Sequence, residues 1–92
     1  MIMRSDGGGI EVLAGDRAYA LSKRELRGLL FLRIRVDLNE DGSDRATVGP
    51  WSDRRWVRFL LGGRPYLISS DRVIAVLRGD VPADELVRVG GP

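Results

Sequence analysis

The stretch from Leu29 to Leu38 constrains the fold most, because apolar and charged residues alternate along it. Successive side chains of a β-strand point to opposite faces of a sheet, so this period predicts a half-buried strand. Its inward face would carry Leu30, Leu32, Ile34, Val36 and Leu38. Its outward face would carry Phe31, Arg33, Arg35 and Asp37. An outward face with two arginines and an aromatic ring raises the question of what lies against it.

Shorter elements flank this strand. Residues 10–23 have the pattern of a hairpin, with a tight turn at Gly15. Residues 24–28 would form a helical turn or a connecting loop. An acidic turn over 39–44 and a further strand over 45–49 complete a four-stranded antiparallel sheet.

The period then changes from two to that of a helix. Ser52 is a suitable N-cap for a helix over 51–62, which would end at Gly62. One face of this helix would carry Trp56, Phe59 and Leu60. Trp56 would therefore lie in the core.

The remaining residues predict smaller elements. Residues 65–69 favour a short strand, and Ser69 would cap a helix that ends at Gly79. Its inward residues would be Val73, Val76 and Leu77. Residues 82–89 fit a last helical turn or a short strand.

These elements predict an α+β fold with a four-stranded antiparallel sheet followed by a helix (ββββα), and an additional C-terminal strand and helix. Residues 1–9 end in three glycines and are expected to be a flexible N-terminal arm. Residues 10–92 would form a single α+β domain.

The chain has no cysteine and no histidine among its 92 residues. Disulfides and thiolate metal sites are therefore excluded, and the commonest general base is missing. We expect no catalytic residues, no metal and no cofactor. No apolar run approaches the roughly 18 residues of a membrane helix. We expect a cytoplasmic protein without a membrane partner.

The basic residues are unevenly distributed. Residues 17–35 hold six of them against one acid, Glu25, whereas residues 37–44 are acidic. Fourteen of the 15 basic residues are arginine. Codon bias in a GC-rich genome explains such a preference, and so does recognition of phosphates and bases, which arginine suits better than lysine.

One internal similarity suggests a duplication. The segment beginning at Ile10, "IEVLAGDRAYALS", aligns without gaps against "VRFLLGGRPYLIS", which begins at Val57, 47 residues later. A true repeat would make 57–62 a strand. The spacing of Trp56 and the capping residues favours a helix there instead.

The stretch from Asp16 to Trp56 resembles the single-stranded-DNA-binding family of the transcriptional positive cofactor four coactivator, and its structural relatives the PUR and Whirly proteins. The matching features occur in the family's order: Arg17, Tyr19, Lys23, Gly28, "LFLRIRV", "NEDG", "RATVG" and Trp56. The resemblance covers about residues 15–60. Leu26 and Leu38 stand where the family usually has aromatic residues. The resemblance implies single-stranded DNA binding by a sheet face and a homodimer.

A basic groove with exposed aromatic rings is what single-stranded nucleic acid requires. The candidate binding residues are Arg17, Tyr19, Lys23, Arg27, Phe31, Arg33 and Arg35. The arginines and the lysine would bind phosphates, while the two aromatic rings would stack on bases. We therefore expect a non-enzymatic homodimer that binds single-stranded DNA or RNA with low sequence specificity, in DNA protection, transcription or repair. Such a protein would be nucleoid-associated.

Two alternatives remain open. The chain would instead be a protein-interaction or regulatory module with a duplicated strand-strand-helix unit, in which the arginine face meets an acidic partner or solvent. It would otherwise bind duplex DNA through one basic helix face formed by Arg54, Arg55 and Arg58. Residues 64–92 would close the dimer, cover the sheet edge or recruit a protein partner.

Overall fold

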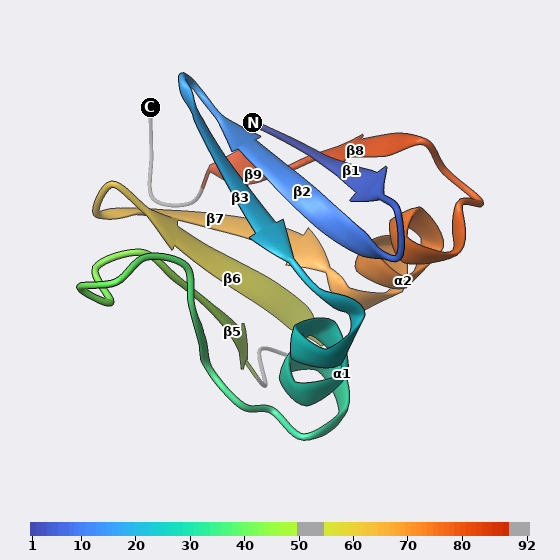
Figure 1. Cartoon of the computed structure of the whole chain (residues 1–92), viewed down its shortest axis with the longest axis horizontal. Helices are drawn as coiled ribbons and strands as arrows, with labels where there is room; N and C mark the ends of the chain where they lie inside the picture. The colour runs from blue at the N-terminus through green and yellow to red at the C-terminus, as the bar shows by residue number, and fades with distance from the viewer. Residues whose placement is uncertain (50–54, 89–92) are drawn as a thin grey trace.

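A computed structural model describes residues 1–49 and 55–88 (Figure 1). Their helices and strands are, in order, β1 (Ile2–Asp6), β2 (Gly9–Ala14), β3 (Arg17–Leu21), α1 (Lys23–Phe31), β4 (Val36–Asp37), β5 (Arg45–Gly49), β6 (Trp56–Leu61), β7 (Arg64–Ser69), α2 (Ser70–Arg78), β8 (Ala83–Glu85) and β9 (Val87–Arg88).

The strands form two antiparallel sheets, ordered β3-β2-β1-β8 and β4-β5-β6-β7-β9. Both sheets contribute to one hydrophobic core, in which Met3 and Val12 come from the first sheet, and Phe59 and Ile68 from the second. The two helices lie at one end of the sheets, away from the tips of the β2–β3 and β6–β7 hairpins (Figure 1). The α+β class is confirmed. Three strands rather than four precede the first helix, so the element order differs from ββββα.

The similarity at a spacing of 47 residues coincides with a repeated unit of structure. The bounds of β2 and α1 recur 47 residues later in β6 and α2, and the second hairpin strand recurs as β7. The two helices share their N-cap as well, because Ser22 caps α1 and Ser69 caps α2. Each helix contacts both sheets, because α1 packs against β2 and β5, and α2 packs against β1, β2, β7 and β8.

The helix predicted over 51–62 is wrong within the described residues. Trp56–Leu61 is β6, paired on both sides with β5 and β7. Val57, Phe59 and Leu61 alternate with more exposed residues, and all three are buried. Ladder hydrogen bonds to two neighbours outweigh the local helix signals. Ser52, the proposed N-cap, lies outside the described residues.

The strand predicted over 29–38 is also wrong, because most of its first half belongs to α1. Ser22 and Glu25 form a capping box: the Glu25 amide donates to Ser22 Oγ at 3.1 Å, and the Ser22 amide donates to Glu25 Oε1 at 3.0 Å. Leu26, Leu29 and Leu30 then bury one face of the helix. Leu32 and Ile34, expected to point inward, are exposed.

The end of α1 contains the one non-glycine residue with a positive φ among the residues described. Arg33 has φ 55°, and the Ile34 amide beyond it donates to the Gly28 carbonyl at 3.0 Å. A side chain is disfavoured in this conformation, which glycine adopts freely.

We predict that Arg33→Gly raises the free energy of unfolding by about 1 kcal/mol in urea denaturation. The control Arg35→Gly should not stabilise the protein. If both variants were stabilised, or neither, the result would contradict backbone strain at Arg33.

The N-terminal residues are not a free arm. β1 lies between β2 and β8, and Met3 is fully buried. The C-terminal residues extend both sheets, because β8 pairs with β1, and β9 pairs with β7. Ala83–Glu85 and Val87–Arg88 are thus strands, which decides between the two alternatives for this segment in favour of a strand. The hairpin over 10–23, the strands over 45–49 and 65–69, and the helix from Ser69 to Gly79 are confirmed.

Candidate nucleic-acid interface

The seven predicted binding residues do not share one sheet face. Lys23, Arg27 and Phe31 lie four residues apart along α1, and all three are exposed. Side chains at this spacing form one row on a helix. Phe31 is 67% exposed. α1 therefore carries a short basic row that ends in an aromatic ring, instead of a strand face.

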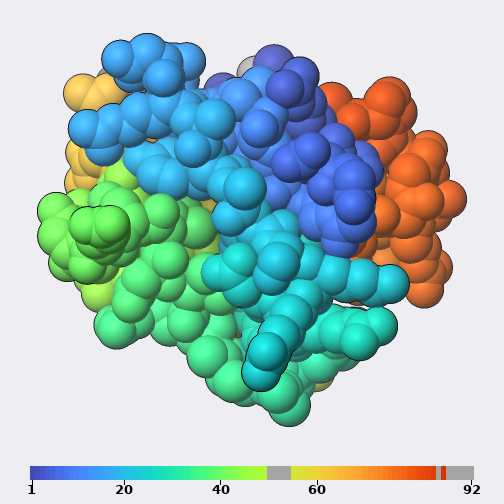
Figure 2. All heavy atoms as spheres, viewed as in Figure 1, coloured from blue at the N-terminus to red at the C-terminus, as the bar shows by residue number. Residues whose placement is uncertain are grey.

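Arg17 and Tyr19 belong to a separate cluster around Asp44, whose side chain is almost fully buried. The Tyr19 hydroxyl donates to Asp44 Oδ2, and the Gly62 amide donates to Oδ1 at 2.7 Å. Arg17 Nη1 lies 3.6 Å from Oδ2 on the exposed side. This cluster joins the β2–β3 hairpin, the loop before β5 and the β6–β7 turn; Figure 2 shows the loop, in green, against the blue hairpin. Tyr19 is only 8% exposed, so its ring is not available to stack on bases.

Burial, followed by the hydrogen bond to Asp44, raises the pKa of Tyr19 above its usual value of 10.0. An unfolded chain would ionise this tyrosine at lower pH than the folded chain. The contribution of neutral Tyr19 to stability is therefore complete below about pH 10 and is lost as pH rises through the folded pKa.

We predict that the free energy of unfolding falls between about pH 9 and 11 and that Tyr19→Phe makes this fall shallower. Urea denaturation across this range measures the effect. A slope unchanged in Tyr19→Phe would show that the shifted tyrosine does not govern alkaline stability.

Arg33 and Arg35 are exposed but do not alternate along a strand. Arg33 follows α1 in the left-handed conformation, and Arg35 Nε lies 3.3 Å from Asp37 Oδ1. Arg35 also borders a shallow hollow of about 220 Å³ on the outer face of the second sheet. We call the residues that line it the basic face: Arg35, Arg45, Thr47, Arg58 and Leu60.

Strand register places these side chains together. Arg45 pairs with Leu60, and Thr47 pairs with Arg58 across β5 and β6. Their neighbours Ala46 and Phe59 are buried, so the alternate residues point away from the core. Leu67 of β7 pairs with Arg58 and continues the same face. The outer surface of β5–β7 thus combines arginines with half-buried apolar side chains.

Three arginines line the basic face, and the Asp37 carboxylate lies beside it, because Asp37 pairs with Arg45 across β4 and β5 and forms an ion pair with Arg35. The arginines outnumber this acid, so the face is net basic. Among the described residues, neither Arg45 nor Arg58 forms an ion pair. The first sheet differs at the equivalent position: Glu11 stands 47 residues before Arg58, and Arg4 donates to it at 2.7 Å. At this position the first sheet therefore carries a paired carboxylate, whereas the second carries an arginine.

The sequence prediction included only Arg35 of the basic face. Arg58 was assigned to a helix face with Arg54 and Arg55, and Arg54 lies outside the described residues. The alternation of Val57, Phe59 and Leu61 was the signal that would have placed Arg58 outward. Trp56 lies on the same outward face of β6 as Arg58 and is half-buried, so it is not the core residue that the sequence predicted.

Two further findings, on metal sites and on membrane-spanning helices, apply to residues 1–49 and 55–88. No group of three or more acidic, histidine or cysteine side chains in these ranges is placed to hold a metal ion. No helix in the same ranges is long and apolar enough to cross a membrane.

No family model, curated protein or solved structure matches the chain, so any function assigned to the basic face rests on its own residues.

Proposed function

We propose that the chain is a non-enzymatic protein that binds single-stranded nucleic acid through the basic face. The observation that carries this proposal is the pair Arg45 and Arg58, which line one hollow and form no ion pair among the described residues, while the nearby Asp37 is paired with Arg35. Guanidinium groups donate bidentate hydrogen bonds to phosphate oxygens, and a local excess of positive charge attracts the backbone. Sequence specificity would be low, because phosphate contacts carry no base information.

A single strand suits this face better than a duplex. Trp56, Leu60 and Leu67 are half-buried on the same side of the sheet as Arg58. Unstacked bases bring apolar and π faces to such side chains, whereas the bases of a duplex are stacked inside it. The family resemblance also implied a sheet face, but residues 29–31 of the predicted strand that helped to carry it belong to α1, so the proposal rests on the basic face itself.

Fluorescence anisotropy with labelled oligonucleotides tests the proposal. The protein should bind a single strand more tightly than the matched duplex, and affinity should fall steeply between about 50 and 200 mM salt. Preference for duplex would favour groove binding instead. Absence of binding at the lower salt concentration would overturn the proposal.

The second candidate is the protein-interaction module with a duplicated strand-strand-helix unit. It is favoured by three exposed apolar side chains, Phe31, Leu32 and Ile34, around the end of α1. Exposed apolar clusters mark partner surfaces, including those of homodimers. Sedimentation equilibrium of the chain and of Leu32→Ser tests this: a dimer that the substitution dissociates supports self-association, and a monomer in both contradicts it.

A further inference from the structure

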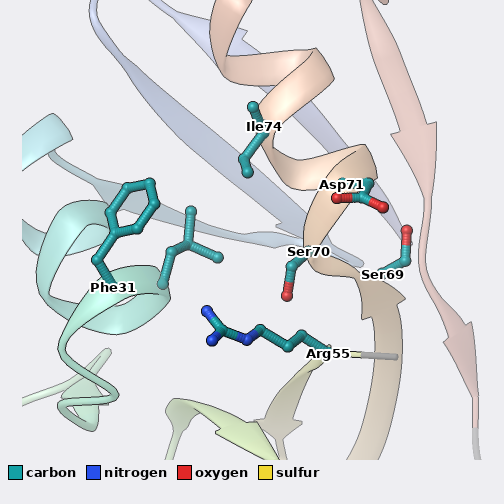
Figure 3. A pocket seen from close by; sticks show the side chains of 7 residues that line it. Phe31, Arg55, Ser69, Ser70, Asp71 and Ile74 are labelled. Atoms are coloured by element: carbon teal, nitrogen blue, oxygen red, sulfur yellow. The ribbon is translucent and has the colours of Figure 1, made fainter. Parts of the chain in front are cut away.

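The end of the molecule that carries both helices contains a cavity of about 590 Å³, separate from the basic face (Figure 3). Leu30 and Phe31 of α1 form one wall, which is apolar. The other wall is polar at Arg55, Ser69, Ser70 and Asp71, and Ile74 of α2 adds an apolar side chain above them. Volumes of about 300–1,000 Å³ are typical of sites for small ligands.

The polar wall contains a buried hydroxyl without a partner. Ser70 is only 8% exposed, and its Oγ forms no hydrogen bond with any residue that the structure describes. Figure 3 shows this oxygen directed into the cavity, on the side of the Arg55 guanidinium. Leaving a buried hydroxyl unsatisfied is unfavourable, so such a group in a cavity wall points to a ligand.

The same wall is the N-terminus of α2, a helix of nine residues. Two amides of its first turn already have acceptors: Arg72 donates to Ser69 Oγ at 3.3 Å, and Ser70 donates to the Arg55 carbonyl at 3.1 Å. The amide of Asp71 has no acceptor within the helix. A helix N-terminus attracts negative charge, which adds to that of Arg55.

The arrangement of charged side chains around the cavity is compatible with a negatively charged ligand. Arg55 extends along its lower side, whereas the Asp71 carboxylate lies apart from the guanidinium in Figure 3. Arg72, from the same helix, is held by Asp84 at 2.8 Å and is not among the lining residues. The opposite wall presents the exposed ring of Phe31.

We propose that this cavity binds a nucleoside monophosphate, with the phosphate on Ser70 Oγ, the Arg55 guanidinium and the N-terminus of α2, and the base against Phe31. The phosphate would give Ser70 the acceptor that it lacks. Base stacking on an aromatic ring requires only an exposed π face, which Phe31 supplies. This site is independent of the basic face, because the two share no residue.

Isothermal titration calorimetry with adenosine monophosphate, adenosine and inorganic phosphate tests the site. The monophosphate should bind at least about tenfold more tightly than either fragment, because each lacks one half of the contacts. Arg55→Gln and Ser70→Ala should each weaken binding of the monophosphate by about tenfold. Arg24→Gln and Ser5→Ala, at exposed positions elsewhere, are the matched controls and should leave affinity unchanged.

Thermal denaturation of Ser70→Ala without ligand provides a second readout. Removing an unsatisfied hydroxyl should raise the melting temperature while binding weakens, and a purely structural serine would not give this combination. Equal affinity for adenosine and its monophosphate, or unchanged binding in Ser70→Ala, would overturn the proposal. Absence of monophosphate binding to the unmodified protein would overturn it as well.

Discussion

Replacing Asp44 with alanine should lower the free energy of unfolding by about 3 kcal/mol, the largest effect on stability that we expect from a single polar side chain. Asp44 is 1% exposed and accepts from the Tyr19 hydroxyl and the Gly62 amide. Alanine would leave both donors without their acceptor, and the unpaired groups, rather than the lost attraction to Arg17, account for most of the cost. Urea denaturation at neutral pH measures it.

Asp80→Ala is the matched control, because Asp80 is exposed. It should change stability by no more than about 0.5 kcal/mol. Tyr19→Phe should cost less than Asp44→Ala, and the double variant should cost less than the two single changes combined, because both remove the same hydrogen bond. Additive costs, or an Asp44 variant as stable as the control, would show that this cluster does not hold the hairpins together.

The second large effect concerns nucleic-acid binding. The double change Arg45→Gln and Arg58→Gln should weaken binding of a single-stranded oligonucleotide by about a hundredfold, roughly tenfold for each guanidinium. The slope of log affinity against log salt should become shallower by about 1.4, since two phosphate contacts are lost. Anisotropy titrations at several salt concentrations give both quantities.

The double change Lys23→Gln and Arg27→Gln is the matched control, because it removes the same charge from the row on α1. It should weaken binding far less. A larger loss of affinity in the Lys23 and Arg27 variant would instead place the interface on α1, as the sequence predicted for these two residues. Equal losses in both variants would mean that net charge, rather than the basic face, governs binding.

Local signals were sufficient where a cap or turn decides the structure. The N-cap Ser69 and the terminal Gly79 defined α2, and Gly15 defined the first hairpin. The capping box of Ser22 and Glu25 is a signal of the same kind, but the sequence prediction did not use it. Helix period and strand period overlap in a short leucine-rich stretch, so periodicity alone does not separate them.

Pairing between distant segments explains the other differences. β1 is ordered by β2 and by β8, which is about 80 residues away, and no local pattern in residues 1–9 indicates that partner. β6 is a strand because β5 and β7 flank it, although its residues also fit a helix face. The 47-residue similarity contained this information, because the hairpin over 10–23 predicts its counterpart.

The candidate site was less predictable than the fold. Charge segregation drew attention to arginines, but which of them share a surface depends on strand register. Arg45 and Arg58 are brought together by the pairing of β5 with β6, whereas Arg33 and Arg35 are separated by the end of α1. Tyr19 was expected to stack on bases, yet the buried Asp44 holds it in the core.

Amide chemical shifts of the ¹⁵N-labelled protein, recorded as a short single-stranded oligonucleotide is added, test the basic face most directly. The largest changes should fall on β5 and β6, at Arg45, Thr47, Arg58 and Leu60, with smaller changes on the first sheet. Changes concentrated on residues 23–31 of α1, or no changes at a saturating oligonucleotide concentration, would contradict binding through this face.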